Sequence, residues 1–392
     1  MKNLVFVRLS LLGLLLSASA CSDSASVGAV RFALDTLPND RVVARNADVT
    51  GPPRWRLVER LRLGSALEEG PSLFGAIGGL AIGDGGEIYV LDSQAAEVRA
   101  FSADGTFLRS FGGGGEGPGE LANPTGLVWG PEGDLWVLNW SNARYSSYTP
   151  STGEVGREPR RRVSFAQFPW PGRFDVSGRL VDIGLDGAGR TAALRLGEDF
   201  VPSDTITLPQ PYDDALVTFS RGGQMIASMP EPFAPQPVWA PRPRGGIVVG
   251  EGRAYRLHRI SFGGDTTLTV EVDRPLAPVA PEEADSAMAR FRQMAESLGG
   301  ATPDRQPSSR ETKPAHGGLF VDDQDRTWVV AILPGGLRRW DLFAPDGRLL
   351  GQVESDASAG YRLPAVRGSL VAMATEVDGV PSVIVYEMVE GD

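Results

Sequence analysis

The chain has 392 residues, of which 42% are hydrophobic, and this is enough to bury a large core. Its 49 glycines and 30 prolines predict a globular fold rich in turns. The formal net charge of −11 argues against nucleic acid as a partner, because binding to phosphates needs a basic surface that displaces counterions.

Residues 1–20 have the pattern of an export signal. Lys2 precedes a short apolar run from Leu4 to Leu16, and small residues follow it. The run is too short to span a bilayer, which takes about 20 residues. Cys21 comes next and is the only cysteine in the chain, so it can form no internal disulfide.

The placement of Cys21 after Ala18 and Ala20 resembles the bacterial lipoprotein signal, in which this cysteine becomes the diacylated N-terminus. The resemblance implies outer membrane lipid as a partner, and Ser22 after the cysteine favours an outer membrane lipoprotein. The same residues also fit an ordinary cleavage signal, which leaves a soluble periplasmic or secreted protein as the alternative. Residues 21–52 are polar and lack periodicity, so we expect a flexible tether.

An internal repeat dominates the rest of the chain. Residues 79–101 recur in altered form at residues 126–148, so that Gly79 aligns with Gly126 at a displacement of 47. A third copy begins at Gly318. Periods of about 40 to 50 residues built from short strands are typical of propeller blades, because one four-stranded unit cannot bury both its faces alone.

Hydrophobic alternation between Gly- and Asp-containing turns predicts the individual strands. In the first repeat they are expected at residues 79–82, 87–91, 98–101 and 107–111. Further blades follow from residues 126, 173, 237 and 317, and the C-terminal strands occupy residues 369–388. Residues 215–232 have no clear assignment.

One segment has helical periodicity instead. Apolar residues recur at helical spacing from Ala284 to Leu298, and Gly299 ends the pattern. We expect this helix to pack on the propeller, within an insertion that spans residues 276–313.

The length of the repeat also predicts the number of blades. Without residues 1–52 and the insertion, six blades would have about 50 residues each and seven about 43, and six is closer to the period of 47. The fold class is therefore an all-β, six-bladed β-propeller over residues 53–392 with one inserted helix, preceded by a signal peptide and tether. A strand at residues 55–63 precedes the first repeat, and we expect it to pair with the C-terminal strands and close the ring.

The glycine-rich stretch from Phe111 to Gly126, with its flanking strands, resembles NHL-repeat propellers and the bacterial six-bladed propeller lipoproteins related to them. Two repeats match well, and the unit at residues 317–353 matches fairly. The resemblance implies a propeller in the bacterial cell envelope and little about activity, because most of this group have no assigned function.

Metal sites are expected from clustered His, Cys, Asp and Glu. Only His258 and His316 are present, too few for the several-histidine zinc site of some lyases among NHL propellers. The resemblance to some six-bladed lactonases implies calcium bound by Glu, Asn and Asp, with Asp92 and Asn139 at equivalent strand ends as candidates. Alternatively these two residues cap loops. We predict no metal site and no cofactor, with calcium as the open alternative.

A ligand site is expected on the propeller face built by the loops between second and third strands and between blades. Trp140, with polar neighbours, has the composition of a sugar or peptide site, namely an apolar plate with directional hydrogen bonds. The alternative is that Trp140 covers the gap between two blades. The candidate ligand-binding residues are Asp92, Gln94, Asn139, Trp140, Asn142, Arg144 and Arg253.

Two functions follow as hypotheses. The first is a monomeric, exported and lipid-anchored module that binds a peptide, glycan or partner protein without catalysis. The second is a calcium-dependent hydrolase or lactonase with oxygen ligands on the propeller axis. Convergence of several carboxylate or amide oxygens on that axis would favour the second.

Overall fold

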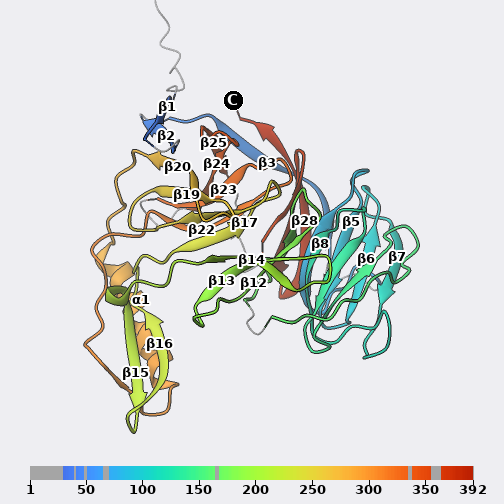
Figure 1. Cartoon of the computed structure of the whole chain (residues 1–392), viewed down its shortest axis with the longest axis horizontal. Helices are drawn as coiled ribbons and strands as arrows, with labels where there is room; N and C mark the ends of the chain where they lie inside the picture. The colour runs from blue at the N-terminus through green and yellow to red at the C-terminus, as the bar shows by residue number, and fades with distance from the viewer. Residues whose placement is uncertain are drawn as a thin grey trace, which may run out of the picture.

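The computed structural model describes residues 30–38, 41–47, 51–64, 70–163, 167–333, 338–354 and 363–391. The predicted signal peptide and Cys21 lie outside these residues. The described chain is almost entirely β-structure, with one α-helix (Figure 1). The predicted all-β propeller with an inserted helix is confirmed.

Most of the described strands group, in chain order, into six units of mainly antiparallel neighbours, and the last two units are joined into one eight-stranded sheet. The first unit contains β4 (Ile77–Ile82), β5 (Ile88–Asp92), β6 (Glu97–Phe101) and β7 (Phe107–Gly112). The second contains β8 (Pro124–Trp129), β9 (Leu135–Asn139) and β10 (Arg144–Tyr148). The third contains β11 (Arg173–Phe174), β12 (Leu180–Leu185), β13 (Thr191–Leu196) and β14 (Pro202–Thr207).

The remaining units follow the same order along the chain. The fourth contains β17 (Val238–Pro241), β18 (Ile247–Gly250), β19 (Arg256–Ile260) and β20 (Thr266–Val272). The fifth contains β22 (His316–Val321), β23 (Thr327–Ile332), β24 (Arg338–Phe343) and β25 (Leu349–Glu354). The sixth contains β26 (Ala365–Arg367), β27 (Leu370–Val377), β28 (Val380–Glu390) and, from the N-terminal part, β3 (Arg54–Leu63).

The sequence repeat corresponds to equivalent strands in neighbouring units. Trp129 Nε1 donates a hydrogen bond of 2.8 Å to the carbonyl oxygen of Ile82, the residue 47 positions earlier. At Gly79 a Cβ atom would lie 2.6 Å from the backbone nitrogen of Leu127. The repeated glycine therefore allows the innermost strands of two units to approach closely.

The second unit lacks a regular fourth strand among the described residues. Its chain continues alongside β10 and forms several backbone hydrogen bonds with it, but the two bridges, Tyr148 with Val155 and Arg144 with Arg160, stay isolated. Pro159 cannot donate a backbone hydrogen bond, which interrupts regular pairing there.

The predicted ring closure is confirmed. β3 pairs antiparallel with β28, from Leu63 opposite Val383 to Trp55 opposite Glu390. The first residues of β3 also pair in parallel with the end of β25, where Arg54 lies opposite Gln352. Figure 1 shows the blue β3 beside the C-terminal strands. One N-terminal strand thus covers the exposed edges of the last two units.

The prediction of a flexible tether over residues 21–52 is wrong for part of that segment. β1 (Arg31–Thr36) and β2 (Val42–Ala47) form a hairpin, and β2 pairs in parallel with β20. Asn46 is buried and donates a 3.0 Å hydrogen bond to the carbonyl oxygen of Gly347. The outer edge of the fourth unit provides the pairing partner, which the sequence of this segment alone does not reveal.

The inserted helix also differs from its predicted position. α1 (Pro281–Glu296) packs on a hairpin of β15 (Leu216–Arg221) and β16 (Gln224–Pro230), which β21 (Thr302–Pro303) extends. Phe291 of α1 lies among the apolar residues of this hairpin rather than on the blades. The hairpin and helix lie apart from the main body in Figure 1. Residues 215–232, unassigned from sequence, thus form the sheet that the helix covers, with a short 3-10 helix (Asp213–Ala215) before it.

A buried polar cluster joins the second and third units. The carboxylate of Asp182 accepts hydrogen bonds from Tyr145 Oη at 2.5 Å and from Trp170 Nε1 at 2.7 Å. Arg161 Nε lies 3.0 Å from the same carboxylate, and the side chains of Arg161 and Asp182 are 3% and 0% exposed. A similar cluster surrounds Asp341 in the fifth unit.

The stability of the fold is expected to depend on His316 at acidic pH. The imidazole of His316 is buried, and its Nε2 accepts a hydrogen bond from the backbone N–H of Gly252 at 3.1 Å. Burial lowers the pKa of His316 from 6.5 to about 4. Between these pH values the unfolded chain binds a proton that the folded chain excludes, so stability falls as the pH falls.

The expected loss is about 3 kcal/mol between pH 7 and pH 4. Denaturant unfolding of the wild type and His316→Gln at several pH values measures it, because glutamine can accept the same hydrogen bond without titrating. The free-energy difference between the two proteins should shrink toward low pH. A constant difference would contradict a neutral buried His316.

Candidate functional site

A cavity of about 300 Å³ lies where the innermost strands of the six units meet. Its wall includes residues of β4, β8, β11, β17, β22 and β26, one strand from each unit. We call it the axial cavity. Because each unit supplies one strand, the cavity can be complete only after the ring has closed.

Part of the wall of the axial cavity is apolar. Residues 169–172, which have the sequence Pro-Trp-Pro-Gly, line the cavity directly before β11. Aromatic and aliphatic side chains continue it from other units. The apolar wall residues include Ile77, Leu80, Leu127, Trp170, Phe174 and Phe320.

Arg173 contributes a positive charge to the same wall. Its Nη1 donates a 3.1 Å hydrogen bond to the backbone carbonyl of Asp322, across from β11 to the fifth unit. Within the described residues, the guanidinium forms no ion pair. Burial lowers the pKa of Arg173, while Asp322, Asp323 and Asp325 act in the opposite direction. Arg173 is therefore partly desolvated without a carboxylate bound to it.

Asp322 and Asp323 also line the axial cavity but differ in their contacts. The carboxylate of Asp322 accepts hydrogen bonds from Arg326 Nε at 2.6 Å and from Trp328 Nε1 at 2.8 Å. Asp323 remains exposed and has no ion pair within the described part of the chain. Although the residue is exposed, the surrounding wall desolvates its carboxylate in part, and this effect first and the charge of Asp322 second raise the pKa of Asp323.

A shallow groove adjoins the axial cavity and shares Trp129 and Arg367 with it. The guanidinium of Arg367 lies 5.7 Å from the centre of the Trp129 ring, and Tyr89 meets the same ring edge-on at 5.6 Å. Arg367 also pairs with the exposed Asp84. Trp129 and Arg367 therefore lie at the boundary between the axial cavity and the groove.

Asp92 was predicted to bind a ligand, but its carboxylate binds backbone groups of the protein itself. Its carboxylate is 1% exposed and accepts four backbone hydrogen bonds, from Gly75 at 2.9 Å and from Ala76, Gln94 and Ala95 at 3.1 Å each. It also lies 3.3 Å from Arg99. These contacts agree with the alternative role, a cap that holds two loops together.

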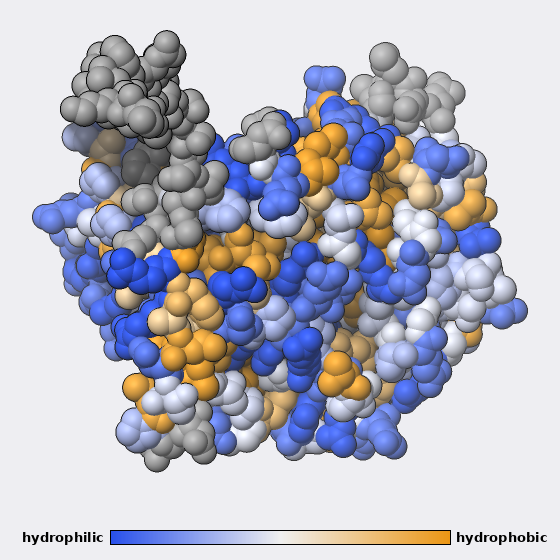
Figure 2. Space-filling model, turned by 90° about the horizontal axis from the view of Figure 1, so that it is seen from above, coloured by the Kyte–Doolittle hydropathy of each residue, from blue (hydrophilic) through white to orange (hydrophobic). Residues whose placement is uncertain are grey.

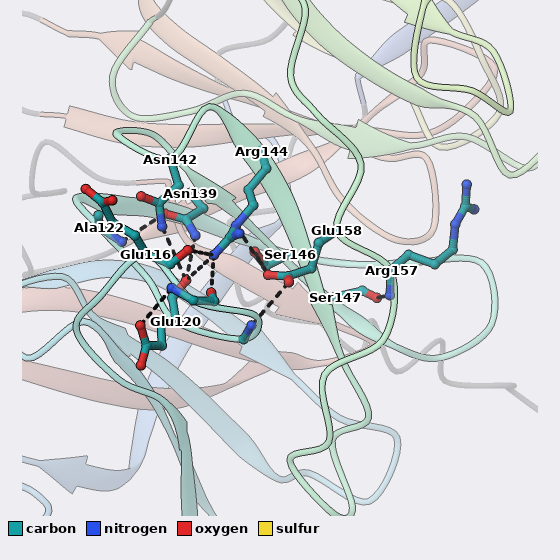
Figure 3. A network of polar contacts seen from close by, with 12 residues as sticks. Glu116, Glu120, Ala122, Asn139, Asn142, Arg144, Ser146, Ser147, Arg157 and Glu158 are labelled. Carbon is teal, nitrogen blue, oxygen red and sulfur yellow. Dashed lines mark hydrogen bonds and ion pairs between the residues drawn. The ribbon is translucent and has the colours of Figure 1, made fainter.

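Asn139, Asn142 and Arg144 all hold the glycine-rich loop before β8 (Figure 3). The Asn139 amide accepts from the N–H of Ala122 and donates to the carbonyl oxygen of Glu120, both at 2.8 Å. Asn142 Nδ2 donates to Gly115 at 3.0 Å, and Arg144 Nη2 to Glu120 at 3.0 Å. The glycine-rich loop that carries the resemblance to NHL propellers is therefore held in its conformation by these three side chains.

The other predicted residues lie at separate places. Trp140 meets Phe168 edge-on at 5.6 Å and packs between the second and third units. Gln94 is exposed in the first unit. Arg253 lies in the fourth unit, 3.8 Å from the centre of the Tyr212 ring, where it pairs with Asp214. A ligand-binding role for the predicted set stays a prediction, and the structure does not gather it into one cavity.

Sequence reasoning did not select Arg173, Asp323 or Arg367. Arg173 follows an irregular proline-rich segment, and Asp323 and Arg367 belong to hairpins of two other units. The position of Arg173 offered one signal. It follows a segment that departs from the repeat, and ligand-specific residues are expected at such departures.

Metal ligation has no support among the residues described. No three of their His, Cys, Asp and Glu side chains lie where they could hold one metal ion together. The acidic groups on the axis are Asp322, whose oxygens bind Arg326 and Trp328, and Asp323. This arrangement does not fit the six to eight oxygen ligands that calcium takes.

No protein-family model matches the sequence, and no curated protein matches it. Solved structures do resemble it. A Bacteroides fragilis protein described as exported is 9% identical, with a TM-score of 0.50 over 86% of this chain and 96% of its own. Virginiamycin B lyase from Staphylococcus aureus is 11% identical, with a TM-score of 0.43 over 86% and 100%. Regucalcin, a calcium-binding protein from Agrobacterium tumefaciens, is 11% identical, with a TM-score of 0.39 over 86% and 96%. At these identities the likeness concerns the fold alone.

Proposed function

We propose that the protein is a non-catalytic binding module that holds a small ligand or a short peptide in the axial cavity. The observation that supports this is the cavity itself, which one strand from each of the six units lines. Its volume of about 300 Å³ lies at the small end of the range for ligand pockets. Apolar walls with a few charged groups are typical of sites that fix the orientation of a ligand.

A short peptide fits this cavity better than a folded partner protein does, because a volume of about 300 Å³ admits only a few residues. Figure 2 shows one face on which hydrophobic residues form separate areas within a mainly hydrophilic surface. A glycan is the remaining alternative. For the calcium-dependent hydrolase or lactonase, no set of described residues offers a supporting observation.

Two tryptophans allow a matched test of the site. Trp129 lines the axial cavity, whereas Trp140 belongs to the site predicted from sequence, and both are partly buried with an edge-on aromatic neighbour at 5.6 Å. A panel of dipeptides and disaccharides would be screened by thermal shift, followed by calorimetry. For a dipeptide that binds, Trp129→Ala should weaken binding about tenfold or more, because a tryptophan in a binding site commonly contributes about 2 kcal/mol.

Trp140→Ala should bind that dipeptide as the wild type does. Loss of binding in Trp140→Ala alone would move the site to the loops predicted from sequence. A disaccharide that binds in place of the dipeptides would favour the glycan. If no compound in the panel shifts the melting temperature, the proposed binding function fails.

We also propose that acylation of Cys21 anchors the protein to the outer membrane. The support is the sequence pattern, with the only cysteine directly after an export signal. Within the described residues, no helix has the length and apolarity needed to cross a membrane. Two acyl chains would hold the protein stably, since each buried methylene contributes about 0.8 kcal/mol.

Labelling with radioactive palmitate tests this anchor. The wild type should incorporate label and sediment with outer membranes, whereas Cys21→Ser should do neither. Equal labelling of the two proteins would remove the lipoprotein proposal and favour a soluble exported protein.

A further inference from the structure

We propose that the axial cavity recognises a zwitterion of amino-acid type, such as a free apolar amino acid or an apolar dipeptide. Arg173 binds the carboxylate of this ligand and Asp323 its ammonium group. The inference rests on the proposed function, since it specifies the ligand of the same cavity.

Arg173 has unused capacity to bind an anion. A guanidinium carries five N–H donors, and the described contacts of Arg173 use one of them, on the carbonyl oxygen of Asp322. Its planar shape matches a carboxylate with two parallel hydrogen bonds. The partly desolvated position makes such a bond stronger than it would be in water. Asp322, Asp323 and Asp325 act on this charge without forming an ion pair with it, whereas a ligand carboxylate would bind the guanidinium directly.

Asp323 offers the complementary group. It belongs to the hairpin between β22 and β23, lines the same cavity and forms no ion pair with Arg173 or with another described residue. Its neighbour Asp322 differs, because Arg326 and Trp328 occupy that carboxylate. Asp323 accepts a backbone hydrogen bond from Gly368 and lies within the fields of Arg367 and Arg326, but no ion pair occupies it, so it is the more accessible acidic group of the wall.

The two charges, neither of which is in an ion pair among the described residues, together favour a zwitterion over a simple ion. The charged residues that line the cavity are two arginines and two aspartates, so their formal charges cancel. An anion bound at Arg173 would be repelled by Asp322 and Asp323, and a cation at Asp323 would be repelled by Arg173 and Arg367. A ligand that carries both charges avoids each repulsion.

The apolar wall accounts for the rest of the ligand. Ile77, Leu80 and Phe320 line the cavity beside the charged residues. Burial of an aliphatic side chain there would contribute through the hydrophobic effect, whereas a sugar would leave hydroxyl groups against apolar surface. We therefore expect leucine-like side chains to be preferred.

Calorimetry on the folded protein with four forms of one dipeptide tests the inference at pH 7. The forms are Leu-Leu as the zwitterion, N-acetyl-Leu-Leu as the anion, Leu-Leu amide as the cation and N-acetyl-Leu-Leu amide as the neutral form. We expect Leu-Leu to bind most tightly, with a loss of about tenfold or more when either charge is blocked, as for other hydrogen bonds to charged groups.

Two variants assign each charge to its partner. In Arg173→Gln, Leu-Leu and its amide should bind with equal affinity, because the carboxylate has lost its partner. In Asp323→Asn, Leu-Leu and its N-acetyl form should become equal. Arg244→Gln and Asp265→Asn, in hairpins of the fourth unit, serve as controls and should keep the wild-type order. Should Arg173→Gln not fold, the exposed Asp323 carries the test.

The outcomes separate the two levels of the proposal. If the neutral form binds as tightly as the zwitterion and Trp129→Ala weakens both, the cavity is a binding site but the zwitterion inference is wrong. If only the anion or only the cation binds, the inference is likewise overturned. If none of the four forms binds and the wider panel also fails, the proposed function falls with it.

Discussion

Deletion of residues 53–63 is expected to unfold the whole propeller rather than one blade. The deletion removes β3, the outer strand of the sixth unit and the parallel neighbour of β25. Leu63 is buried in the core between the sixth and first units, and Leu61 packs against that core. Trp55 and Leu57 pack against the core between the fifth and sixth units.

The size of this effect follows from the side chains lost. Full burial of a large apolar side chain contributes about 1.5 to 3 kcal/mol. Leu63 is buried and the other three side chains are partly buried, so their sum is still a large share of the about 5 to 15 kcal/mol that stabilises a typical domain. The deletion also exposes β28 along the length that β3 covered, which promotes aggregation through strand pairing.

Solubility and circular dichroism melting of the truncated protein measure the effect. A matched control removes residues 30–47, whose hairpin pairs with the outer edge of the fourth unit. We expect this control to stay folded with a lower melting temperature, because it does not close the ring. A soluble protein lacking residues 53–63 with an unchanged melting temperature would contradict the role assigned to β3.

Asp182→Asn is expected to destabilise the protein by about 3 to 5 kcal/mol, the usual cost of leaving one member of a buried ion pair without its partner. The substitution keeps the size of the side chain but removes the charge that Arg161 faces. It also disturbs the acceptors used by Tyr145 and Trp170. The effect should appear as a lower denaturant midpoint with little change in slope.

An exposed ion pair provides the control for Asp182→Asn. Arg348 lies 3.9 Å from Asp346, and their side chains are 54% and 46% exposed, so Asp346→Asn should cost under about 1 kcal/mol. Adding Arg161→Met to Asp182→Asn should recover part of the lost stability, because it removes the buried charge that faced the Asp182 carboxylate. Equal effects of Asp182→Asn and Asp346→Asn would show that the buried cluster contributes no more than a surface pair.

Much of the fold could be predicted because its information is local and repeated. In the first repeat, the expected strand at residues 87–91 corresponds to β5 (Ile88–Asp92), and the others agree similarly. Period-two alternation and glycine turns specify each hairpin, and the displacement of 47 residues specifies how units follow one another. The closing strand was predictable because a propeller cannot leave an edge open.

Errors arose where the pairing partner is distant or where the segment lies outside the repeat. β2 has its partner β20 more than 200 residues away, so the sequence of residues 42–47 alone gave no sign of a strand. The helix at residues 281–296 was recognised, but its hairpin was not, because β15 and β16 lie outside the repeat.

The sequence by itself determined the repeated strands and the strand that pairs with the C-terminal strands, because these depend on alternation and turn residues near in the chain. Only the tertiary structure decided which groups the polar side chains contact. Asp92 and Asn139 hold loops because backbone groups from preceding segments converge on them. Arg173, Asp323 and Arg367 come from three units, so only a closed ring brings their charges to one cavity.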